Sequence, residues 1–529
     1  GFRAPSNGAA VTINDIRANK TGSELVIISH KDLKAQVDRY ASYRSSQSPN
    51  KISTSVYYVD EIFNEFSAGM MDPTAIRDFL KYAYDNWQTK PFYVLFFGDG
   101  DYDYLNVEKL NKNFVPTYQT IESLSEILSY PTDDYFARVS GKDLRIDLAI
   151  GRLNVQSLAE AETVVNKIIK YENNSEKGLW RTNITLIADD GPAEVGYDDG
   201  SIHTSQSENL SNRYIPKFFD QNKIYLVAYP TVISGLGRRK PDVNRAIIDA
   251  VNNGTLILNF IGHGNPNVWA HENVFEKSSS IPQLKNGHFF FLTAATCDFG
   301  RYDDPTQQSS TEIMNNMKDA GSIGAFTAAR VVYSTANEII NDYLYANLFK
   351  REQNLPFRIG RSYFLAKQTR FEDNDEKFHL FADPTIRLSQ PTLPASIDSI
   401  NGKNVSTSIQ INALGNVKVK GKVRNIDGTN SNFSGEAIVS VYDSERQMFF
   451  SEMNYWVKLQ GGLIFRGRTN VTNGNFQTEF VVPKDISYEN KNGKVSAYVY
   501  NSTNDGIGYT TDVIVGGTNP NAVNDGKGP

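Results

Sequence analysis

The sequence has little cysteine: Cys297 is the single thiol in 529 residues. One thiol excludes an intrachain disulfide and any metal site built from several cysteines. Cytosolic proteins usually carry more cysteines, so this scarcity favours a protein that works outside the cytoplasm. It also makes Cys297 a residue to consider for chemistry.

Long hydrophobic runs are absent as well. No apolar stretch approaches about 18 residues and the first residues lack a signal-peptide core, so the sequence predicts no transmembrane helix. A net charge of −6 is small for this length and gives no sign of a nucleic-acid partner. No two of the 6 histidines have the spacing of a helix-borne metal site. We therefore expect no required cofactor and no catalytic metal.

Two apolar runs carry the chemistry that is present. Residues 255–261 (TLILNFI) lead into His263 between two glycines, and residues 289–293 (FFFLT) lead toward Cys297. Short continuous apolar runs are typical of strands buried on both faces of a parallel sheet, where ligands collect beyond the carboxyl ends. If the strands are neighbours, His263 can act as the base that a cysteine nucleophile requires.

The glycines beside His263 leave backbone amides accessible, so we expect the amides of Gly264 and Cys297 to form an oxyanion hole. A buried cysteine acting as a small hydrophobe, near an ordinary loop histidine, is the alternative interpretation. His271, in the loop after His263, is the second candidate base.

Residues 259–275 (NFIGHGNPNVWAHENVF) and 291–300 (FLTAATCDFG) resemble the gingipain family of cysteine peptidases, in the caspase-like clan. The resemblance implies that His263 and Cys297 are the catalytic dyad. It also implies that Asp147, in DLAIGR, orients the histidine as the third member of a triad. An acid at a strand start with no catalytic role is the alternative for Asp147.

The chain divides into α/β and all-β parts. Strands alternating with helices predict doubly wound α/β structure, and the resemblance implies two side-by-side caspase-like subdomains, residues 1–178 and 179–392, the second carrying the dyad. From 393 to 517, apolar residues alternate with polar ones between Gly and Asn turns, which predicts an immunoglobulin-like β-sandwich. Residues 518–529 are interpreted as a linker to a missing C-terminal region, because the chain looks like a piece of a longer protein.

Two acidic segments have roles that the sequence leaves open. The Gly98–Asp101 segment (GDGD) follows an apolar run and fits a structural calcium site or a plain turn, of which we favour the turn. Glu160 and Glu162 fall where a helix is already expected, so neither can be assigned to a specificity pocket for arginine or lysine.

The tail, residues 480–517, resembles the β domain that follows the peptidase unit in the C-terminal signal peptidases of the type IX secretion system (PorU type) of Bacteroidota. This resemblance implies an enzyme associated with the outer membrane at the cell surface, which removes the C-terminal signal domain of secreted cargo. It also implies sortase-like transfer of the new carboxyl terminus to anionic lipopolysaccharide, and an outer-membrane β-barrel partner (PorV type). A general secreted endopeptidase and an inactive scaffold of the same fold are the alternatives.

Overall fold

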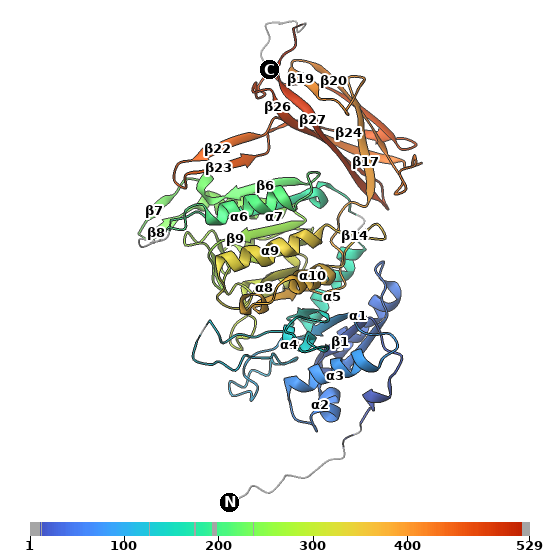
Figure 1. Ribbon diagram of the computed structural model, residues 1–529, viewed down its shortest axis with the longest axis vertical. Coiled ribbons are helices and arrows are strands. Elements are labelled where there is room, and N and C mark those ends of the chain that lie inside the picture. Colours follow the sequence, from blue (N-terminus) through green and yellow to red (C-terminus); the bar gives the residue numbers. More distant parts are fainter. Residues whose placement is uncertain are drawn as a thin grey trace, which may run out of the picture.

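The computed structural model describes residues 11, 13–125, 127–173, 176–192, 198–235 and 237–520. Three parts follow one another along its long axis: a first α/β unit, a second α/β unit and a β domain (Figure 1). Within the described ranges, every helix is too short or too polar to cross a bilayer.

The first unit is a parallel four-stranded sheet in the order β2-β1-β3-β4. Its strands are β1 Leu25–Ser29, β2 Thr54–Tyr58, β3 Tyr93–Phe97 and β4 Ala149–Leu153. Its helices are α1 Lys34–Ser42, α2 Val59–Phe66, α3 Pro73–Asn86, α4 Asp134–Ala137 and α5 Leu158–Glu172. The helix predicted after Asp72 is confirmed as α3: the Asp72 side chain accepts a hydrogen bond from the Thr74 amide, and Pro73 fits the first turn because it needs no amide partner there.

The second unit is a six-stranded sheet in the order β16-β13-β12-β9-β5-β6, parallel except for β16. Its strands are β5 Asn183–Ala188, β6 Asp220–Tyr225, β9 Ile257–Ile261, β12 Phe290–Ala295, β13 Ser322–Ala328 and β16 Phe378–Phe381. Its helices are α6 Ile202–Arg213, α7 Pro241–Asn253, α8 Ser310–Asn316, α9 Ser334–Leu348, α10 Ile359–Thr369 and α11 Asp373–Glu376. Short strand pairs lie outside this six-stranded sheet: β7 Val232–Ser234 with β8 Gly237–Arg239, β10 Val268–Trp269 with β11 Phe275–Glu276, and β14 Arg351–Glu352 with β15 Leu355–Pro356.

The two units meet where β4 of the first sheet approaches the end of β16 in the second. A Cβ on Gly151 would lie 2.3 Å from the Ala382 carbonyl oxygen, so only glycine permits this approach. Beside it, the fully buried Arg44 guanidinium binds Asp383 at 2.5 Å and Glu172 at 2.7 Å. Breaking a buried pair of this kind leaves an unpaired charge, so the pairs hold the junction in one geometry.

The β domain is a sandwich built from one curled sheet. Its strands are β17 Leu393–Ile400, β18 Lys403–Asn404, β19 Ile409–Ala413, β20 Asn416–Val423, β21 Gly435–Tyr442, β24 Leu463–Val471, β25 Asn475–Val481, β26 Lys491–Tyr500 and β27 Asp505–Thr518. The predicted alternation is confirmed in β20, where Val417, Val419 and Val423 are buried and the intervening lysines face outward. The hydrogen-bonded path stays continuous because the long β27 pairs with β26, β17 and β19.

A hairpin of the β domain, β22 Arg446–Phe450 with β23 Tyr455–Leu459, reaches away from the sandwich and lies along the second α/β unit (Figure 1). Its turn carries the buried Met453, whose sulfur accepts a hydrogen bond from Thr204 Oγ1 at 3.7 Å. The Lys458 amide donates to Glu208 Oε2 at 3.1 Å. Thr204 and Glu208 both lie on α6, so the hairpin packs against this helix and stabilises its position.

Candidate active site

Strands β9 and β12 bring the predicted dyad to one rim. They are neighbours in parallel register, with Ile261 opposite Ala295, so the loops carrying His263 and Cys297 leave the same edge of the sheet. A Cβ on Gly264 would lie only 2.5 Å from Thr296 Oγ1, which places the two loops in direct contact. The two strands are thus neighbours, which is the condition that the pairing of His263 with Cys297 required.

A carboxylate orients the His263 ring. His263 Nε2 lies 2.5 Å from Asp199 Oδ2, and the His263 amide donates to Asp189 Oδ2 at 3.0 Å. An ionised carboxylate can only accept, so Nε2 carries the shared proton and Nδ1 is left as the basic nitrogen. The His263 side chain is 38% exposed and that of Asp199 is 9% exposed, which gives the pair access to solvent on the histidine side.

Asp147, which we expected to orient His263, is placed elsewhere. Its Oδ2 accepts hydrogen bonds from the amides of Val139 and Ser140, at 2.8 and 2.7 Å, and it precedes the N-terminal end of β4 in the first sheet. The His263 loop leaves the opposite, carboxyl end of a strand in the second sheet. The structure therefore brings Asp199, and not Asp147, to His263. Asp199 follows β5, the neighbour of β9, and an acid beyond the carboxyl end of a neighbouring strand was the signal available in the sequence.

Cys297 is half-buried at the end of β12. Its thiol donates to the Val332 carbonyl at 3.4 Å and accepts from the Val332 amide at 3.5 Å. Burial raises the pKa of the Cys297 thiol, with the Val332 amide acting in the opposite direction. No hydrogen bond between residues that the structure describes joins the thiol to His263. Catalytic contacts often tighten only when substrate is bound, so the lack of this hydrogen bond does not argue against the pairing.

The amides expected to form an oxyanion hole, those of Gly264 and Cys297, are available. In the described ranges neither donates to a protein acceptor. Directly after Cys297 the chain turns sharply, because Asp298 adopts a φ of 54°. Such left-handed backbone is uncommon outside glycine and is found at functional sites.

Two other histidines surround His263. The exposed His271, our second candidate base, has its ring centroid 5.0 Å from that of His263. His203, on α6, is 4% exposed, and its ring stands at 87° to the His263 ring with centroids 5.2 Å apart. Burial, and then the neighbouring His263, lower the pKa of His203 to about 4. Sequence reasoning missed His203 because nothing in its helical neighbourhood distinguishes it from a surface histidine.

Buried acids behind the His263 loop are already paired. Lys240 Nζ lies 3.0 Å from Asp190 Oδ2, and Arg238 Nε lies 3.0 Å from Glu272 Oε1. Burial raises the pKa of Asp189 well above its usual range, which favours its neutral form. Lys240 and Arg238 thus balance the charges of Asp190 and Glu272.

Asp99, in the acidic segment whose role was open, is occupied by protein contacts. Asp99 accepts from Asn154 Nδ2 at 2.9 Å and from Gln156 Nε2 at 2.8 Å, and burial raises its pKa to about 6. Both oxygens are thus used, as in a side-chain-supported turn. Glu160 and Glu162 lie on α5, as their spacing predicted.

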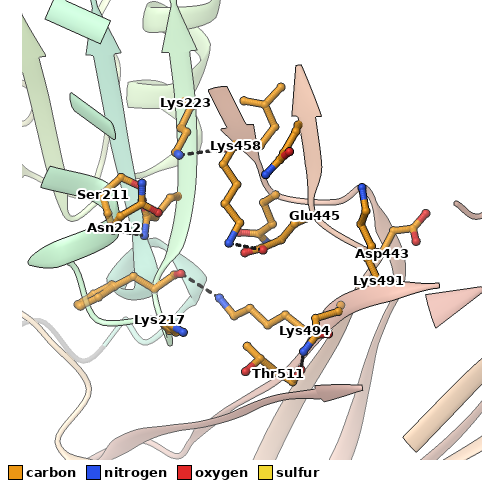
Figure 2. A pocket seen from close by; sticks show the side chains of 17 residues that line it. Ser211, Asn212, Lys217, Lys223, Asp443, Glu445, Lys458, Lys491, Lys494 and Thr511 are labelled. Atoms are coloured by element: carbon orange, nitrogen blue, oxygen red, sulfur yellow. Dashed lines mark hydrogen bonds and ion pairs between the residues drawn. The ribbon is translucent and has the colours of Figure 1, made fainter. Parts of the chain in front are cut away.

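A cavity of about 540 Å³ opens elsewhere, between the second α/β unit and the β domain. Lysine side chains enter it from both walls (Figure 2), but Lys223, Lys458 and Lys494 are paired with Glu208, Glu445 and Asp220. Residues near the start of β6 line this cavity, so it lies at the amino ends of the parallel strands. The dyad lies at the carboxyl ends of those strands. The cavity is therefore separate from the candidate active site.

Comparison with known proteins agrees with this geometry. The profile of peptidase family C25 matches residues 18–389. Gingipain R2 and Gingipain R1 of Porphyromonas gingivalis are each 21% identical to the chain, over 409 and 430 residues that cover 74% and 76% of it. The chain spans 49% and 38% of these relatives, half of their length or less.

Among solved structures, the complex of RgpB pro- and mature domains from Porphyromonas gingivalis matches with a TM-score of 0.53 at 17% identity, covering 93% of this chain and 100% of that one. Dimeric latent PorU from the same organism matches with a TM-score of 0.44 at 24% identity, covering 95% of this chain and 44% of that one. The first match confirms the predicted fold class. Because the family profile covers both α/β units, the chain belongs to peptidase family C25.

Proposed function

We propose that the chain is a cysteine endopeptidase that works by acyl transfer. The observation that carries this proposal is the pairing of His263 with Asp199 at the rim that also presents Cys297. His263 Nδ1 takes the thiol proton, and the sulfur attacks the scissile carbonyl while the amides of Gly264 and Cys297 hold the oxyanion. The C–N bond breaks, His263 returns the proton to the leaving amine, and a thioester remains.

The substrate we propose is secreted cargo that ends in a type IX C-terminal signal domain, cleaved at the outer face of the cell. Its support is the resemblance of residues 480–517 to the β domain of such signal peptidases. The paired acids behind the His263 loop also favour this function, since Asp190 and Glu272 are not free to recognise an arginine or lysine side chain.

The fate of the thioester depends on which nucleophile reaches it. Water would release a free carboxyl terminus, whereas an amine on anionic lipopolysaccharide would produce a sortase-like transfer. We further propose that an outer-membrane β-barrel partner (PorV type) holds the enzyme, with the β domain as part of the docking surface. Co-purification of the full chain with that partner, before and after substitutions on the β domain, tests the docking.

The cleavage reaction is tested with cargo carrying an intact C-terminal domain, followed by mass analysis of the new terminus. We expect one cut before the signal domain, and a loss of at least about 1,000-fold in Cys297→Ala and in His263→Ala. Retained cleavage in Cys297→Ala would refute the mechanism. Equal cleavage of unrelated unfolded proteins would instead identify a general endopeptidase.

A further inference from the structure

Three side chains around the candidate base point their ligating atoms at one another. One ligand atom each of Asp199, His203 and His263 lies within 4.8 Å of the other two. Asp199 Oδ2 is 2.5 Å from the His263 nitrogen and 3.4 Å from the His203 nitrogen. The loop before α6, α6 itself and the loop after β9 each contribute one group.

His203 has no evident structural role in this arrangement. It is 4% exposed, and within the described part of the chain neither ring nitrogen has a hydrogen bond of regular geometry, although Nε2 lies 3.4 Å from Asp199 Oδ2. A buried polar side chain without such a partner is unfavourable and calls for an explanation. Its Nε2 faces Asp199 and lies on the side of His263, so the ring is oriented toward the space between these two residues.

The geometry fits a tetrahedral metal ion. Ligand bonds of about 2.0–2.1 Å at tetrahedral angles put two ligand atoms about 3.3 Å apart and two imidazole centres about 5 Å apart. The observed values are 3.4 Å for the His203–Asp199 contact and 5.2 Å for the ring centroids. The short contact between Asp199 and His263, at 2.5 Å, has to open. The partly exposed His263 leaves a route for the ion and a fourth position for water.

From this geometry we infer that Asp199, His203 and His263 form a binding site for a divalent transition-metal ion. Two imidazoles and one carboxylate suit Zn²⁺, whereas Ca²⁺ and Mg²⁺ prefer oxygen ligands.

Occupation of the site would inhibit the enzyme, a consequence that rests on the proposed function. A metal on Nε2 of His263 takes the position of the proton shared with Asp199, so the neutral ring carries its single proton on Nδ1 instead. Nδ1 then cannot accept the proton of Cys297.

Calorimetric titration of ZnCl₂ into metal-free Cys297→Ala protein tests the site without its thiol and without any activity. We expect one ion per chain, bound at least about tenfold more weakly when His203→Gln is added, because one ligand is lost. Adding His288→Gln, at a half-buried histidine stacked on Trp180, is the matched control and should leave the affinity unchanged. Equal affinity in the His203→Gln and His288→Gln backgrounds overturns the proposal.

Cobalt uptake covers the case in which His203→Gln fails to fold. Cys297→Ala protein should acquire the visible absorption of four-coordinate Co²⁺, without sulfur-to-metal charge transfer; no uptake of Co²⁺ or Zn²⁺ overturns the site. In the thiol-containing chain, the zinc concentration that halves the rate of cargo cleavage should rise at least about tenfold in His203→Gln. Equal sensitivity would mean that zinc acts on Cys297 alone. A chain without peptidase activity would fail the proposed function and still give the calorimetric result.

Discussion

A single contact sets the chemistry available to His263. Asp199 Oδ2 lies 2.5 Å from Nε2 of His263, which favours a proton on Nε2 and leaves Nδ1 free. Cys297 is a half-buried thiol that contacts Val332. The sequence resemblance assigned the orienting role to Asp147, whereas the structure places Asp199 beside the ring. Substituting each acid in turn compares the two assignments.

Asp199→Asn should lower turnover by at least about 100-fold, because the amide can donate to the ring and favours the wrong tautomer. Asp147→Asn, the matched control, removes acceptance of two backbone amides far from the rim and should leave turnover within a few-fold of wild type. Steady-state cleavage of one peptide by both variants checks this. A larger loss in Asp147→Asn than in Asp199→Asn would restore our sequence-based assignment.

The protonation of Cys297 gives a pH prediction. Burial raises the pKa of its thiol, so a smaller fraction is thiolate at neutral pH than for an ordinary cysteine. The rate of alkylation by iodoacetamide should therefore keep increasing above about pH 8.5, the ordinary thiol pKa. A rate already at its plateau below pH 7 would indicate a preformed thiolate–imidazolium pair instead.

At the scale of elements, the hairpin β22–β23 connects the β domain to the active site through α6. Met453 in its turn contacts Thr204, one residue from His203, and the hairpin backbone binds Glu208 on the same helix. Sequence periodicity does not predict such an arm, because its strands are short and carry both buried apolar residues, such as Val457, and exposed ones, such as Trp456.

Met453→Ala should destabilise the chain by about 2 kcal/mol or more, the usual range for emptying a buried methionine site, and should lower turnover as α6 loosens. Met448→Ala, on the same hairpin but 41% exposed, should change stability by less than about 0.5 kcal/mol. Urea denaturation with parallel peptide assays measures both. Similar losses in the two variants would show that the buried turn has no special role.

On the scale of the whole molecule, polar contacts join all three parts. Arg181 Nη1 of the second unit lies 3.1 Å from Asp505 of the β domain, and Lys494 of the β domain lies 2.8 Å from Asp220. A fragment ending near Gln390 would lose these partners together with the hairpin. It is therefore expected to lose stability.

The junction between the two α/β units supplies a prediction that depends on pH. Lys167 of α5 is buried and donates to the carbonyls of Met314 and Asn315, at 3.2 and 2.9 Å, at the end of α8. Burial lowers its pKa from 10.5 to about 7. Between these values the folded chain holds it neutral and the unfolded chain holds it protonated, so its contribution to stability grows as pH rises and is lost as pH falls toward 7.

The free energy of unfolding of wild type, relative to Lys167→Met, should therefore rise by up to about 1.4 kcal/mol per pH unit between pH 7 and 10. Chemical denaturation of both proteins across this range measures the difference. Lys170→Met, at an exposed position of the same helix, is the control. A difference independent of pH would mean that Lys167 stays protonated in the folded chain.

The sequence by itself determined the elements and the candidate pair, His263 and Cys297. Continuous apolar runs locate β9 and β12, alternation locates β20, and the ends of the two runs place His263 and Cys297 just beyond the strands. These are local signals, because side-chain periodicity follows backbone geometry over a few residues. Only the tertiary structure decided which acid meets His263 and that His203 stands beside it. Asp199 lies 64 positions away in an irregular segment, and its place depends on β5 being the neighbour of β9, which no local pattern specifies.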